Sequence, residues 1–275
     1  MRIFELHFNP PLKDGTSDYF FDNFCYEPKN IYEKRLGSLY IVGEISNLLP
    51  HNLGLLKKIA QIIKEKYYVS SHQKPAKSFQ EALRAANDFL AKEIAKDNVS
   101  WLGNLNLAVL SLTSKDLGNS FSLNLAKVGK IKIISENNGK ITNIDKNLDL
   151  EGIEPYPLKV FTNIVTGKIV EGNKIAILTS EIFEFLSKEE LLNNLFKIDF
   201  LEENKIREVL KNKEKEASAL KGILFLIDST KQISEKPRVL TFKKELEKFS
   251  LKDALSPFIR IMTGFLKSLR NSFLI

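Results

Sequence analysis

Two consecutive amphipathic helices, placed between groups of strands, constrain the fold of this chain most. In residues 53–67 and 78–94, apolar side chains recur at steps of three and four, which is the helical period. The first segment follows a helix-start signal at Pro50. The second has Ser78 as its expected N-cap and Glu81 three residues later, a capping box. Each helix presents one apolar stripe, so each is expected to cover a face of a sheet.

Short apolar runs bounded by polar turns predict the strands. These runs are residues 3–8, 19–26, 39–42, 105–112, 122–128, 130–134, 175–178 and 223–227. Gly139 in the stretch ENNGK marks a hairpin-like turn, and further helices are expected around residues 187–194 and 202–212. Because the helices come in pairs and do not alternate strictly with strands, the order favours an α+β sandwich over a doubly wound parallel sheet.

Charge is spread unevenly along the chain, whose net charge is +7. Residues 231–275 hold 10 Lys and Arg against 4 acidic residues, whereas the first 230 residues hold 31 against 30. We therefore predict a domain at 1–230 and a basic linker and tail at 231–275. A nearly neutral body argues against nucleic-acid binding and gives an interaction role to the tail, with a solvated charged linker as the alternative.

The tail has the pattern of a basic amphipathic helix that begins with Pro257 at its first position. Phe265 lies on the apolar stripe, and Arg260, Lys267 and Arg270 supply the charge. Such a helix can lie on an anionic membrane surface or dock into a groove of a partner. Alternatively, it packs back on the domain. The apolar end SFLI leads us to expect that the chain belongs to a longer, membrane-anchored protein.

Several classes of protein are disfavoured by the sequence. The single cysteine, Cys25, rules out an intramolecular disulfide, and no signal peptide or spanning segment is evident. We therefore expect a cytoplasmic location, with the tail able to reach the inner face of a membrane. There is no GxxxxGKS or GxxxxGKT, HExxH, GxSxG or CxxC motif, and the three histidines lack the spacing of metal ligands.

The order of six stretches resembles that of the motifs in the PPM, or PP2C-type, protein phosphatases, over roughly residues 1 to 228. In chain order they are LYIVGEISN, SFQEALRAANDFL, WLGNLNLAVLSL, NLAKVGKIKII, FTNIVTGKIVEGNKIAILTSEIFEFLSKEEL and ALKGILFLI. The resemblance implies a four-layer αββα sandwich of two antiparallel sheets flanked by helix pairs. It also implies two Mn²⁺ or Mg²⁺ ions at one end, which activate a bridging water for attack on phosphorus. Hard divalent ions of this kind prefer short, charged oxygen ligands such as aspartate.

The residues that the resemblance assigns to this metal site are altered. The family's Asp-Gly after the central strand falls at Glu44 and Ile45, and the Ser-Asp-Gly corner has Glu181 and Ile182. The extra methylene of glutamate displaces each carboxylate by roughly 1.5 Å, and isoleucine replaces glycine where the family's backbone bends. A loose match to the family's Asn-x-Asp motif at residues 16–18 retains Asp18.

Two further motifs of the family lack their acid. The Gly-Asp-Ser motif has Lys130 in place of aspartate, and the closing Asp-Asn motif has Ala219. We therefore expect a pseudophosphatase that has lost the dinuclear metal site, needs no cofactor and binds a protein partner or phosphoprotein.

Other interpretations of the same residues stay open. The chain could be a divergent Mn²⁺- or Mg²⁺-dependent phosphatase that uses Glu44, Glu181 and Asp18 as ligands, or a structural, membrane-proximal domain without a phosphorylated ligand. Glu44 and Glu181 could also be ordinary exposed acids, and Glu184 could serve only the helix dipole. Lys130 could lie on the solvent face of an alternating strand.

Overall fold

The structure, a computed structural model, describes residues 1–11, 17–69, 72–114, 120–148, 154–155, 158–198, 201–229 and 237–243. The chain divides into a compact unit, Met1–Lys243, and a second unit, Lys244–Ile275. The second unit lies outside the described residues, and with it the expected tail helix and Arg260, Phe265, Lys267 and Arg270. No helix in the described part of the chain is both long enough and apolar enough to span a bilayer.

Two sheets form the centre of the first unit. The five-stranded sheet has the order β10-β5-β4-β3-β2, and all of its neighbouring strands are antiparallel. Its strands are β2 (Tyr19–Tyr26), β3 (Ser38–Ser46), β4 (Leu105–Ser114), β5 (Ser120–Val128) and β10 (Val165–Val170).

The six-stranded sheet has the order β13-β1-β12-β11-β6-β7. Its strands are β1 (Arg2–Phe8), β6 (Lys132–Asn137), β7 (Lys140–Asn143), β11 (Lys174–Leu178), β12 (Gly222–Asp228) and β13 (Arg238–Phe242). All of its pairs are antiparallel except β1 with β13, which is parallel. The compact unit thus includes β13, which lies within the stretch that the sequence assigned to the linker. A separate short pair is formed by β8 (Glu154–Pro155) and β9 (Leu158–Lys159).

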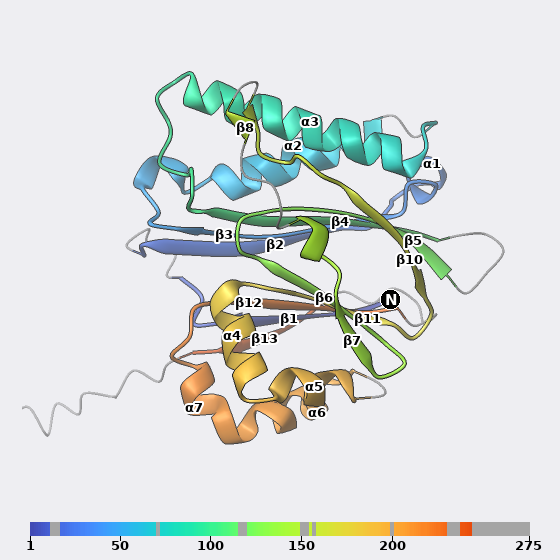
Figure 1. Cartoon of the computed structure of the whole chain (residues 1–275), viewed down its shortest axis with the longest axis vertical. Coiled ribbons are helices and arrows are strands. Elements are labelled where there is room, and N and C mark those ends of the chain that lie inside the picture. The colour runs from blue at the N-terminus through green and yellow to red at the C-terminus, as the bar shows by residue number, and fades with distance from the viewer. Residues whose placement is uncertain are drawn as a thin grey trace, which may run out of the picture. The chain divides into compact units, whose positions relative to one another are not determined.

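Helices cover the outer face of each sheet, as Figure 1 shows. Over the five-stranded sheet lie α2 (Leu55–Val69) and α3 (Pro75–Ile94); the short helix α1 (Ile31–Lys34) precedes β3. Over the six-stranded sheet lie α4 (Ser180–Lys188), α5 (Leu191–Phe196), α6 (Glu203–Leu210) and α7 (Glu214–Ala217). Single 3-10 turns occupy Pro50–Asn52, Lys146–Leu148 and Lys211–Lys213.

Three apolar cores separate these layers: one under α2 and α3, one between the sheets, and one under α4 to α7. Alternation along the strands explains this division, because successive side chains point to opposite faces. In β3, for example, Ile41 and Ile45 pack under the helices, whereas Tyr40 and Val42 pack between the sheets. The predicted four-layer αββα sandwich is confirmed.

Of two local sequence signals, the hairpin turn and the helix start, one is confirmed and the other is wrong. The hairpin at Gly139 is confirmed: it joins β6 to β7, and Asn138 and Gly139 both have positive φ, at 50° and 80°. The capping box at Ser78 is wrong. Helix α3 begins one turn earlier, with Lys74 as N-cap and Pro75 in the first position, and Ser78 is fully buried inside the helix. Proline with its fixed φ sets the helix start here.

Candidate functional site

Glu44 lies at one end of the sandwich, between the two sheets. It continues the row of β3 side chains that face the gap between the sheets, after Tyr40 and Val42. Its partner across the sheet is Asn106, near the start of β4. The apolar row thus ends in a polar pair, which places a carboxylate at the mouth of the inter-sheet core.

Asn106 connects Glu44 to the turn between β5 and β6. Its Nδ2 donates to Glu44 Oε1 at 3.0 Å, and its Oδ1 accepts from the backbone N–H of Lys130 at 2.7 Å. Gly129, at φ +74°, makes this contact possible, because a Cβ there would lie 2.1 Å from Asn106 Oδ1. Lys130 therefore lies in a tight turn before β6 and not on the face of a strand, with its side chain exposed.

Burial raises the pKa of Glu44 to about 7, against the opposing effect of the hydrogen bond from Asn106. The charge of Glu181 adds to the increase, so Glu181 lies within electrostatic reach of Glu44. Close to neutral pH, Glu44 therefore exists in both its protonated and its charged form. A carboxyl that holds a proton is a weaker ligand for a cation than a carboxylate.

Glu181 lies in the first turn of α4, directly after the corner that follows β11, and its side chain is exposed. The corner is held by Thr179, whose N–H donates to the carbonyl of Ile223 at 3.1 Å while its Oγ1 accepts from the N–H of Ile223 at 3.2 Å. The next residue, Ile182, belongs to α4 and is fully buried in the core between α4 to α7 and the six-stranded sheet. The corner thus fixes the position of Glu181, and Ile182 anchors the helix.

Asp18, directly before β2, and Tyr19, its first residue, both contact Lys221, which the sequence did not single out. The Nζ atom of Lys221 lies 3.5 Å from Asp18 Oδ1 and 4.4 Å from the centroid of the Tyr19 ring. The pKa of Tyr19 is raised by burial, then by the charges of Asp18 and Glu181, which places Glu181 near the same ring. Lys221 follows Ala219 by two residues and directly precedes β12. This position beside an altered motif is the signal in the sequence that could have indicated a site residue.

Of the remaining altered positions, Ile45 packs in a core and Ala219 lies in an exposed turn. Ile45 is 1% exposed and packs under α2 and α3, and its strand continues regularly through this position, paired with Phe20 and Leu105. Ala219 is exposed in the turn after α7. Where the resemblance implied a backbone bend beside metal ions, this chain has a regular strand and a core side chain.

These donors differ from a set suited to two hard divalent ions. Asp18 is paired with the ammonium of Lys221, Glu44 is hydrogen-bonded to Asn106, and Lys130 adds a second cation at the same end of the sandwich. Within the described residues, no group of three or more His, Cys, Asp or Glu side chains is arranged to hold a metal ion. Two octahedral ions require more carboxylates and fewer neighbouring cations than these residues offer.

Searches by sequence found no relatives: no family model matches the chain, and no curated protein matches it. Among solved structures, the SiaA-PP2C domain of Pseudomonas aeruginosa is similar, with a TM-score of 0.50 and 11% identity over 82% of this chain and 84% of that one. PppA, a regulatory component of T6SS in P. aeruginosa, has a TM-score of 0.49 and 14% identity, over 76% of this chain and 96% of that one.

The serine/threonine phosphatase PstP of Mycobacterium tuberculosis is also similar, with a TM-score of 0.48 and 14% identity over 82% of this chain and 96% of that one. At such identities a structural likeness establishes the fold and not the chemistry. The layer order, the two sheets and the likeness to the SiaA domain lead to the same conclusion. This chain has a PP2C-like phosphatase fold.

Proposed function

We propose that this protein is a pseudophosphatase: a PP2C-like domain that no longer catalyses phosphate hydrolysis and acts as a binding or regulatory module. The observation that carries the proposal is the position of Lys221. Its ammonium group pairs with Asp18 and lies over the ring of Tyr19. The chain thus supplies a positive charge of its own beside the one aspartate that the resemblance retains. A resident ammonium beside a carboxylate opposes the binding of a divalent ion there.

Packing supports the same proposal. Ile45 and Ile182 are buried in two separate helix-covered cores, so each contributes to folding at a position where the resemblance implies a flexible glycine. Restoring glycine would remove a buried isoleucine, and large-to-small changes of this kind in a core typically cost about 2–5 kcal/mol. Buried isoleucines at these two positions are compatible with a domain that binds a partner and does not catalyse hydrolysis.

The partner that we propose is a protein, phosphorylated or not, bound in the cytoplasm. The basic segment 231–275 would supply a second contact, to that partner or to the inner face of a membrane, through Arg260, Lys267 and Arg270. Its charge is the support for this part of the proposal, because the segment holds most of the chain's net positive charge.

Calorimetric titration with Mn²⁺, combined with an assay on a phosphoserine peptide, tests the proposal. The protein, Glu44→Ala, Glu181→Ala and the exposed control Glu208→Ala are compared. We expect no saturable binding of Mn²⁺ up to millimolar concentrations and no turnover. Micromolar binding that both site variants abolish, with turnover that disappears in Glu181→Ala and persists in Glu208→Ala, would overturn the proposal.

One observation favours an alternative, a divergent Mn²⁺- or Mg²⁺-dependent phosphatase. Glu44 and Glu181 interact electrostatically although they come from different layers of the sandwich. Like charges held near each other mark many sites that bind a cation. Under this alternative, Glu44, Glu181 and Asp18 would hold the ion, and the outcome that overturns our preferred proposal would support it.

A further inference from the structure

A pocket lies at the other end of the six-stranded sheet, between α5 and the β6–β7 hairpin. We call it the hairpin pocket; its volume is about 780 Å³. It is lined by Glu136, Asn138, Gly139, Lys140, Ile141, Gly172, Lys174, Asn193, Phe196 and Lys197. This volume falls within the roughly 300–1,000 Å³ of typical ligand sites. In strand β11, Lys174 lines the pocket and Leu178 directly precedes the corner at Thr179, roughly 13 Å away along the strand.

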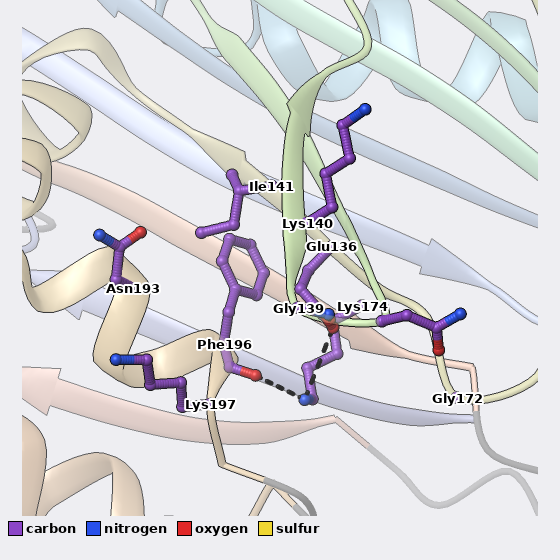
Figure 2. A pocket seen from close by; sticks show the side chains of 10 residues that line it. Glu136, Gly139, Lys140, Ile141, Gly172, Lys174, Asn193, Phe196 and Lys197 are labelled. Atoms are coloured by element: carbon purple, nitrogen blue, oxygen red, sulfur yellow. Dashed lines mark hydrogen bonds and ion pairs between the residues drawn. The ribbon is translucent and has the colours of Figure 1, made fainter.

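A buried ion pair forms the floor of the hairpin pocket. Lys174 Nζ lies 3.7 Å from Glu136 Oε2 and donates to the carbonyl oxygen of Phe196 at 2.7 Å, and the two charged side chains are only 7% and 9% exposed. Glu136 Oε1 also accepts from the N–H of Gly139 at 2.6 Å, which fixes the hairpin turn to the floor. Figure 2 shows both contacts of Lys174. The pocket is therefore preformed, and the charge of Glu136 is already compensated.

The rim and wall of the pocket differ in chemistry. Lys140 on the hairpin and Lys197 at the end of α5 are exposed and lie on different sides of the pocket (Figure 2). Ile141 and Phe196 lie between them and form an apolar wall. With the floor pair balanced, the two rim lysines leave a net charge of +2 around an apolar surface. A ligand that fits must carry negative charge at two separated points and an apolar group between them.

We infer that the hairpin pocket binds an acidic peptide segment of a partner protein, with an apolar side chain against Ile141 and Phe196 and with acidic side chains at Lys140 and Lys197. A peptide meets the requirement because its side chains place charge on both sides of a central residue. Strand β7, which carries Lys140 and Ile141, is the last strand of its sheet, so a peptide chain can approach along it. The inference goes beyond the proposed function, since the pocket shares no residue with the candidate site.

Fluorescence anisotropy tests the inference on the full chain. The probe is a fluorescein-labelled short peptide with a central phenylalanine flanked by glutamates. The test variant is Lys140→Glu/Lys197→Glu. The matched control, Lys168→Glu/Lys188→Glu, makes the same change of charge at exposed lysines of β10 and α4. We expect the test variant to bind about tenfold more weakly and the control to stay within about twofold of the parent.

A second arm tests the apolar wall. Ile141→Ser should weaken binding, whereas Val170→Ser, at an exposed position of β10, should not. A probe with serine in place of phenylalanine should bind the parent protein more weakly than the original probe. The inference is overturned if the original probe does not bind at millimolar concentration, or if the control double variant loses as much affinity as the test variant, since the net charge alone would then explain binding.

The two proposals fail separately. Mn²⁺-dependent turnover would overturn the pseudophosphatase proposal and leave the anisotropy result unchanged, because the lysines of the rim contact none of the candidate-site residues. Conversely, equal binding of the peptide probe by the parent protein and Lys140→Glu/Lys197→Glu would overturn the proposed peptide site. It would leave the pseudophosphatase proposal unchanged.

Discussion

The two ends of the six-stranded sheet each place a lysine beside a carboxylate, but in opposite environments. At the hairpin pocket, Lys174 and Glu136 are 7% and 9% exposed, and Lys174 also bonds a backbone carbonyl. At the candidate site, Lys221 and Asp18 are 47% and 77% exposed, and their atoms are 3.5 Å apart. The same pair of residue types therefore serves two purposes.

We expect burial, more than distance, to decide what each ion pair contributes to stability. A buried pair is costly to break, because the remaining charge has no water to solvate it. An exposed pair is screened by solvent and contributes little to stability. We therefore expect Lys174 to contribute strongly to the stability of the fold, and Lys221 to affect mainly the charge presented at the candidate site.

The largest predicted effect is for Lys174→Met. The substitution leaves Glu136 charged and buried, and it leaves the carbonyl of Phe196 without its donor. We expect a loss of about 3–5 kcal/mol in the free energy of unfolding, measured by urea denaturation. The exposed control Lys168→Met should stay within about 0.5 kcal/mol of the parent.

A double variant separates the charge from the packing. In Lys174→Met/Glu136→Gln the buried charge is gone, while the amide oxygen still accepts from the N–H of Gly139. We expect this variant to recover at least half of the stability lost by Lys174→Met. A single variant as stable as Lys168→Met would contradict the contrast between the two ends of the sheet.

Glu44→Gln should raise the free energy of unfolding of the protein at high pH. The pKa of Glu44 is raised from 4.5 to about 7 in the folded protein, so the folded state holds a proton that the unfolded state releases. Folding stability therefore falls as the pH rises from about 4.5 to about 7. Glutamine carries no such proton, so the variant should gain up to about 3 kcal/mol over the parent above pH 7 and almost nothing near pH 4.5.

Urea denaturation at a series of pH values measures this difference. The exposed residue Glu184, one turn after Glu181, provides the control variant Glu184→Gln, whose free energy of unfolding at pH 7 should stay within about 0.5 kcal/mol of the parent. If Glu44→Gln and the parent show the same dependence on pH between 4.5 and 8, burial of Glu44 does not raise its pKa as described.

Asn106→Ala, at the same end of the sandwich, should change the free energy of unfolding less than the preceding substitutions. Asn106 is 8% exposed and bonds both Glu44 and the N–H of Lys130. Loss of both bonds should cost about 1–3 kcal/mol. Because the hydrogen bond from Asn106 lowers the pKa of Glu44, its removal should also move the pH-dependent part of the stability curve to higher pH. Asn194→Ala, on the exposed face of α5, is the control.

Sequence periodicity predicted the elements with strong apolar patterns and missed those without them. The eight predicted runs correspond to β1 to β6, β11 and β12, because each of these strands contains a short run of apolar residues. The strands β7 and β10 were missed, since their side chains are mostly exposed. Strand β13 follows a polar stretch and pairs in parallel with β1, a long-range contact that no local pattern reports.

The candidate site was predictable only in part. The sequence nominated Glu44, Glu181 and Asp18 through their positions along the chain. It could not show that Asn106 lies opposite Glu44, because that depends on the register of β3 against β4. Nor could it show that Lys221 reaches Asp18, since 203 residues separate the two in sequence.

The smallest predicted effect is for Lys221→Met. Lys221 and Asp18 are 47% and 77% exposed, and Tyr19 is only partly buried, so the free energy of unfolding should fall by no more than about 1 kcal/mol. This loss should shrink at high salt, where exposed charges are screened. Lys211→Met, at another exposed lysine, is the control for general charge effects.

The same position also tests the comparison of the two ends in a second way. If Lys221 supplies the positive charge of the candidate site, Lys221→Asp should leave the fold intact and place two carboxylates side by side. That variant should bind Mn²⁺ more tightly than both the parent and Lys211→Asp in calorimetric titration, because carboxylates without a neighbouring ammonium attract a divalent ion. Equal affinity in all three proteins would mean that Lys221 does not control the charge of this end. The contrast with Lys174 would then be one of stability alone.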